Sequence, residues 1–212
     1  MIDVAELRSF QERFAAIRTL DKTDLVPRAE AIQLSIQDVG TGGCFEHLGC
    51  TYLIREKNHY EETSDDFNTK KGYFIFELVC LCIDTGDTVY FEWEYDDELE
   101  ISITIDRFSF RNVKDEKGAP VDGDDLDQIA RDKDAVVVDG ETFWYEDDWA
   151  SVFARNGREE KVYMYEFENE AGTKFLSIEE WQGAGKDEYR IYTSAPVPAG
   201  SLVIISKGEI SA

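Results

Sequence analysis

The feature that most restricts the fold of this chain is an alternation of apolar and polar residues along most of its length. In one stretch, Ile101, Ile103 and Ile105 alternate with Ser102, Thr104 and Asp106. Successive side chains of a β-strand point to opposite faces, so this pattern is typical of a half-buried strand. Similar stretches recur between Tyr73 and Ser206, separated by glycine-containing turns. We therefore predict a mainly β fold: two related antiparallel β meanders in barrel- or sandwich-like units, with an N-terminal helix.

Individual elements can be assigned from the same pattern. A short helix is expected over 126–133, and loops over 61–71 and 114–125. Strands are expected over 31–37, 51–60, 73–83, 89–95, 101–106, 136–138, 141–146, 149–154, 162–168, 175–180, 188–193 and 202–206. The nearly continuous apolar segment 73–83 is interpreted as a strand buried on both faces.

Residues 2–20 have helical rather than strand periodicity. Val4, Leu7, Phe10, Phe14 and Ile17 form one apolar stripe. A short helix needs packing to be stable, so the stripe should bind the β body, or else a second copy of the chain. We favour the β body because the tether to Pro27 is short. The expected organisation is an N-terminal helix and linker (1–28), a first β unit (29–121) and a second β unit (122–212). Weak recurrences between the last two suggest duplication, although any two meanders share such patterns.

The charge of the chain restricts its partners. There are 46 acidic and 22 basic residues, and the net charge is −24. Nucleic acid and anionic lipid are disfavoured, whereas a basic protein partner or a cation is compatible. The apolar segment 73–83 is too short to span a membrane as a helix, and the first residues lack the pattern of a signal peptide. We expect a cytoplasmic protein with a protein partner, and a homodimer remains an alternative.

Two groups of residues have metal-ligand chemistry. Cys44, His47 and Cys50 form a C-x-x-H-x-x-C motif, which Cys80 and Cys82 could complete as a zinc site. The alternative interpretation, which we favour, is that all four cysteines are reduced, buried thiols. Asp122 and Asp124 lie in an acidic loop that lacks the residue order of an EF-hand, so a solvated loop is favoured over calcium. We therefore expect no cofactor and no structural metal.

Catalytic signatures are weak. The acid pairs Glu92 with Glu94 and Glu166 with Glu168 could serve as general acid and base, but alternate acids usually mark the wet face of a strand. Asp147 and Asp148 are expected at a loop tip, where the flanking Trp144 and Trp149 would anchor a partner. Phe10 and Phe14 of the N-terminal helix are further candidate contacts.

Three segments of the sequence resemble a known bacterial family. The segments are 42–54 (GGCFEHLGCTYLI), 91–95 (FEWEY) and 174–181 (KFLSIEEW). Across residues 30–206 the chain resembles the bacterial domain of unknown function 4178. The resemblance implies no catalytic residues and at most an accessory role.

Three functional hypotheses follow. The chain is most simply a non-catalytic protein-binding or scaffold module. Alternatively it is an acidic immunity-type protein that neutralises a basic partner, or an enzyme with an unrecognised carboxylate site.

Overall fold

The computed structural model describes residues 11–15, 17–18, 25–183 and 188–209. The described residues confirm the mainly β prediction. They divide into two compact units that are interleaved in the sequence. Unit 1 takes its described residues from 1–58, 76–101 and 197–212, and unit 2 takes its residues from 59–75 and 102–196. The segments 29–121 and 122–212 therefore each contribute to both units, and the duplication hypothesis stays a prediction.

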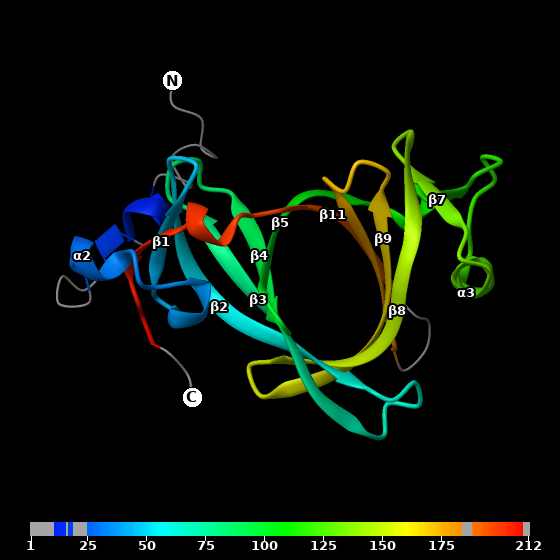
Figure 1. The fold of residues 1–212 in the computed structure, drawn as a ribbon, viewed down its shortest axis with the longest axis horizontal. Coiled ribbons are helices and arrows are strands. Elements are labelled where there is room, and N and C mark those ends of the chain that lie inside the picture. The colour runs from blue at the N-terminus through cyan, green and yellow to red at the C-terminus, as the bar shows by residue number, and fades with distance from the viewer. Residues whose placement is uncertain (1–10, 16, 19–24, 184–187, 210–212) are drawn as a thin grey trace. The chain divides into compact units, whose positions relative to one another are not determined.

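Unit 1 is built mainly from β-strands (Figure 1). Hydrogen bonding joins its strands in the order β12-β1-β2-β3-β4-β5. They are β1 (Cys44–His47), the start of β2 (Cys50–Thr63), the end of β3 (Lys70–Cys82), β4 (Thr88–Tyr95), β12 (Val203–Ser206) and the start of β5 (Leu99–Phe108). Three short helical segments accompany them: α2 (Arg28–Ala31), η2 (Ile36–Asp38) and η4 (Ala199–Ser201). One cluster of its core joins Cys44, Leu53 and Leu81, with Ile83 and Ile205 packed against it.

The strand predicted over 31–37 is wrong, because this segment joins the end of α2 to the start of η2 through a turn. A local capping box explains the difference. The Ser35 backbone N–H donates to Asp38 Oδ2 at 2.9 Å, and Ser35 Oγ accepts from the Gln37 backbone N–H at 3.3 Å. These side chains satisfy backbone groups that a strand would have paired with a neighbour.

Unit 2 contains the longer strands. Its strand order is β5-β11-β10-β9-β8-β7-β6, and β8 also pairs with the end of β2. The strands are β6 (Lys114–Asp115), β7 (Ala135–Val138), β8 (Glu141–Arg155), β9 (Arg158–Asn169), β10 (Phe175–Trp181) and β11 (Glu188–Pro196). Helix α3 (Gly123–Asp132) confirms the expected short helix, and η3 (Phe110–Asn112) precedes β6. Figure 1 shows α3 beside β7 and β8.

Each face of the unit 2 sheet has its own apolar cluster. Leu126 and Ile129 of α3 pack with Tyr165, Phe167 and other residues of one face. The second cluster, on the opposite face, contains Tyr60, Phe153, Val162, Met164 and Trp181, with Ile75 and Trp149 against it. Alternation along β9 produces this division, because Tyr165 and Phe167 point one way and Met164 the other.

The strand over 73–83 is only partly buried. Residues 73–77 are half-buried, whereas Leu78, Cys80, Leu81 and Cys82 are buried. The prediction that this segment is buried on both faces therefore holds only toward the end of β3.

Part of the N-terminal helix is described. Residues 11–15 and 17–18 are helical, and Arg13 Nη1 donates to the backbone oxygen of Asp84 at 2.8 Å. Phe14 and Ile17 are 53% and 47% exposed, so the prediction that they are buried on this chain is wrong. The hydrogen bond of Arg13 connects this part of the helix to the turn at Asp84 within unit 1. Val4, Leu7 and Phe10 lie outside the described residues.

Candidate functional site

The first candidate region is an acidic face on β8 and β9, which we define as Trp144, Asp147, Glu166 and Glu168. In the antiparallel register Trp144 is opposite Glu168, and Asp147 is opposite Glu166. Directly opposed residues share a face of the sheet, so all four lie on the face that α3 does not cover. Trp144 is 45% exposed, Asp147 is exposed, and the two glutamates are half-buried. This arrangement surrounds an accessible indole with carboxylates.

The loop tip expected at Asp147 and Asp148 is wrong. Both residues lie within the continuous strand β8, where the register shifts between Tyr145 and Asp147. This bulge accommodates one extra residue while the strand continues. Asp148 points to the α3 face, where its carboxylate accepts hydrogen bonds from the hydroxyls of Tyr145 and Tyr163. Three of the four predicted partner residues therefore share one face of the sheet: Trp144, Asp147 and Trp149, although Trp149 packs against the apolar cluster there. Asp148 lies on the other face, where the two tyrosines hold it.

The environment of Tyr163 and Tyr165 favours the neutral form of both hydroxyls. Burial, and then the hydrogen bond to Asp148, raise the pKa of Tyr163 well above its usual range. Burial and Asp127 do the same to the pKa of Tyr165, whose hydroxyl donates to Asp127 Oδ1 at 2.7 Å. These groups are hydrogen-bond donors over the physiological pH range rather than bases, so the cluster is structural in character.

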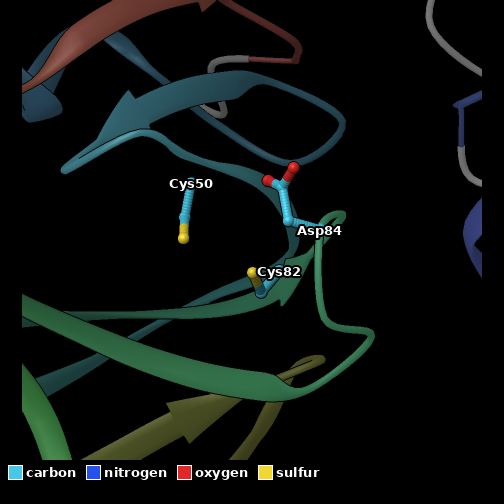
Figure 2. A group of neighbouring side chains, drawn as sticks. All are labelled: Cys50, Cys82 and Asp84. Atoms are coloured by element: carbon cyan, nitrogen blue, oxygen red, sulfur yellow. The ribbon is translucent and has the colours of Figure 1, made fainter.

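The second candidate region is a thiol–carboxylate cluster in unit 1, which we define as Cys50, Cys82 and Asp84. The two sulfur atoms and one carboxylate oxygen all lie within 4.8 Å of one another. Figure 2 shows the three side chains where β2 begins and β3 ends. Cys82 is buried, Cys50 is half-buried and Asp84 is exposed, so the cluster is open to solvent on one side.

Backbone contacts hold the carboxylate of this cluster. The Thr51 N–H donates to Asp84 Oδ2 at 2.7 Å, and the Ile83 N–H donates to the Thr51 oxygen at 2.8 Å. Burial, followed by the neighbouring Cys82, raises the pKa of Cys50. Burial and the same two cysteines raise the pKa of Tyr52 to about 12. The raised pKa values favour the protonated thiol of Cys50 and the protonated hydroxyl of Tyr52.

The predicted C-x-x-H-x-x-C set does not come together among the described residues. Cys44 is buried in the apolar cluster with Leu53 and Leu81. His47 Nδ1 lies 3.1 Å from Ser201 Oγ, and its ring packs edge-on to Phe91. Only Cys50 of this set belongs to the thiol–carboxylate cluster.

The acidic loop at Asp122 and Asp124 has a structural role. Asp122 is the N-cap of α3, where its Oδ1 accepts from the Asp125 N–H at 3.0 Å. In return the Asp122 N–H donates to Asp125 Oδ2 at 3.0 Å. Asp124 lies in the first helical turn, where a negative charge is favourable. The acidic sequence is therefore explained by the start of a helix.

The fold and both regions can now be compared with known proteins. The sequence model of the family described as "Domain of unknown function (DUF4178)" matches residues 40–199, which is most of the chain. The chain belongs to the DUF4178 family. No curated protein and no solved structure matches it. Within DUF4178, the matched range contains all four residues of the acidic face and all three of the thiol–carboxylate cluster.

Sequence reasoning missed the pairing of Cys50 with Cys82, although a signal was present. Each cysteine is 16 residues from residue 66, the centre of the loop expected over 61–71. In a hairpin, residues equidistant from the turn lie opposite each other. This arithmetic places Cys50 beside Cys82, whereas the search for closely spaced motifs grouped Cys50 with His47.

The described residues contain no helix long and apolar enough to cross a membrane.

Proposed function

We propose that this DUF4178 chain is a non-catalytic module that binds a basic protein segment through the acidic face. One observation carries the proposal: an exposed Trp144 lies opposite Glu168 on the same face as the opposed acids Asp147 and Glu166. Like charges directly opposite each other destabilise a sheet, and a bound cation would relieve that repulsion.

The chemistry of the acidic face suits lysine and arginine side chains. An indole face attracts a cation, contributing about 0.5–2 kcal/mol, and carboxylates add charge pairing. Lys71 is a basic group of the chain that interacts with Asp147. Its pKa is raised first by its hydrogen bond to Glu62, at 2.7 Å, and only later in order by Asp147. Lys71 is thus engaged mainly with Glu62. The net charge of −24 would attract a basic partner over longer distances.

A binding titration with a Lys/Arg-rich extended peptide tests the proposal. Tryptophan fluorescence and calorimetry would follow binding at several salt concentrations. Trp144→Ala should weaken binding by about 2- to 30-fold, which corresponds to the loss of one cation–π contact. The double variant Asp147→Asn/Glu168→Gln should weaken it by a similar factor, and the effect should shrink at high salt.

A matched control variant distinguishes binding at the acidic face from general electrostatic attraction between the acidic chain and the basic peptide. Asp124→Asn/Glu116→Gln removes the same number and kinds of charge from exposed positions of unit 2. Asp124 belongs to α3, which packs on the opposite face of the sheet. The control should change affinity by less than about twofold, because exposed charges act weakly beyond a Debye length. Equal losses in both double variants would overturn the proposal, because binding would then follow net charge alone.

The other two hypotheses make different predictions for the same face. An immunity role is the special case in which the basic partner is a toxin, and it predicts that binding blocks the activity of that partner. An enzyme would use Glu166 and Glu168 as reacting groups, and it predicts turnover that Glu166→Gln abolishes. The exposed tryptophan favours binding, because a general acid or base has no need of it.

A further inference from the structure

We infer that Cys50, Cys82 and Asp84 form a binding site for one Zn²⁺ ion, with a fourth coordination position open to water or to a partner. The inference is independent of the proposed function, because these residues belong to unit 1 and the acidic face belongs to unit 2. It rests on the convergence of two thiols and a carboxylate from positions far apart in the sequence.

The donor set selects the metal. Two thiolates and one carboxylate oxygen suit Zn²⁺, whereas calcium and magnesium prefer oxygen ligands alone. With zinc–sulfur bonds of about 2.3 Å and zinc–oxygen bonds of about 2.1 Å, tetrahedral ligand atoms lie about 3.6–3.8 Å apart. The three donor atoms are already within 4.8 Å of one another. Side-chain rotations that move each donor atom by under about an ångström would therefore complete the ligand geometry.

The surroundings of the cluster fit a metal centre. The Thr51 N–H bond to Asp84 Oδ2 orients the carboxylate, as outer hydrogen bonds do for metal ligands. Arg13 Nη1 donates to the Asp84 backbone oxygen at 2.8 Å, which holds the turn and places a positive charge nearby. Two thiolates, one carboxylate and Zn²⁺ sum to a charge of −1, which the guanidinium would balance. Asp84 is exposed, so an ion can enter from solvent.

Binding must release protons. The thiolate is the ligand, so each cysteine loses its proton to solvent when zinc binds. Two released protons make the apparent affinity rise by about 100-fold for each pH unit while both thiols are protonated in the free protein. No oxidant is needed, because neither the sulfur nor the zinc changes oxidation state.

The experiment uses the full chain, purified under reducing conditions and stripped of metal with a chelator. Zn²⁺ alone is titrated by calorimetry, and Co²⁺ serves as a spectroscopic probe of thiolate ligation. We expect one equivalent of Zn²⁺ to bind and Co²⁺ to give a sulfur-to-metal charge-transfer band. Cys50→Ser and Asp84→Asn should each weaken zinc binding by more than about tenfold. Both residues are at least partly exposed, so these variants should fold.

Cys44→Ala is the matched control, because Cys44 is a thiol on the neighbouring strand β1 outside the cluster. It should leave the zinc stoichiometry and the cobalt spectrum unchanged. The inference is overturned if the reduced wild type binds no stoichiometric Zn²⁺, or if Cys44→Ala removes binding as fully as Cys50→Ser. It is also overturned if mass spectrometry of rapidly alkylated protein shows a Cys50–Cys82 disulfide in the cell, because the thiols would then be a redox pair.

Discussion

A buried hydrogen-bond network in unit 2 allows one prediction to be worked out in detail. Glu179 is 3% exposed, and its carboxyl accepts from the Tyr60 hydroxyl at 2.9 Å and from Trp181 Nε1 at 2.7 Å. Tyr60 and Trp181 are themselves buried, at 2% and 7% exposure. Buried polar groups of this kind are costly to leave without a partner. The substitution Tyr60→Phe removes only the donor and leaves the ring packing intact.

The expected loss of stability follows from the loss of one buried hydrogen bond to a carboxyl group. Such a loss costs about 1–3 kcal/mol in the free energy of unfolding. For a chain of this size, 1 kcal/mol corresponds to about 2–4 °C in melting temperature. Tyr60→Phe should therefore lower the melting temperature by about 2–12 °C. The side chain of Tyr60 also packs against Phe153, with ring centroids 4.7 Å apart, and that contact is retained.

Urea denaturation followed by circular dichroism and tryptophan fluorescence measures the change. Tyr95→Phe is the control, because Tyr95 is 57% exposed and should change stability by less than about 0.5 kcal/mol. In a Glu179→Gln background, Tyr60→Phe should cost less than it does alone, because the two residues are coupled. A loss below about 0.5 kcal/mol for Tyr60→Phe in the wild-type background would refute this reasoning about the buried carboxyl.

Three further predictions concern the stability effects of Asp122, Cys44 and Gly43. Asp122→Ala removes the N-cap of α3 and should lower the unfolding free energy by about 1 kcal/mol in urea denaturation, whereas Asp124→Ala should change it by less than about 0.5 kcal/mol. Burial raises the pKa of Cys44 to about 11 from 9.0, although the Phe45 backbone lowers it. The unfolded thiol therefore loses its proton first, so stability falls between about pH 9 and pH 11, by about 1.4 kcal/mol per pH unit from this group, and Cys44→Ala should remove that part of the slope. A Cβ atom at Gly43 would lie 2.6 Å from the Lys207 backbone oxygen, so Gly43→Ala should cost about 1–3 kcal/mol by thermal denaturation. Gly200→Ala, where a Cβ would meet nothing within 4 Å, should cost less than half as much.

The class of the fold and most of its strands can be predicted from local sequence patterns. Period-2 alternation depends only on the pleat of a strand, so β4, β5 and β9 were readable from their own residues. The body of helix α3 was readable from its apolar positions, but its first turn was assigned to a loop, because the capping role of Asp122 was not recognised in the acidic sequence. Local patterns also gave one wrong prediction. The segment 31–37 has apolar residues at strand-like spacing, but the Ser35–Asp38 capping box starts the helical segment η2 within it.

Which chemical groups lie together depends on the pairing of strands in the folded chain. Strand β8 continues through Asp147 and Asp148 because β9 pairs with it on both sides of the bulge, and this divides the two aspartates between opposite faces. Cys50 and Cys82 are separated by a long hairpin, and their register brings them together with Asp84. A pattern along one strand reports which face a side chain takes, but not which strand lies beside it. That information belongs to strand pairing, so both the acidic face and the thiol–carboxylate cluster emerged only from the folded chain.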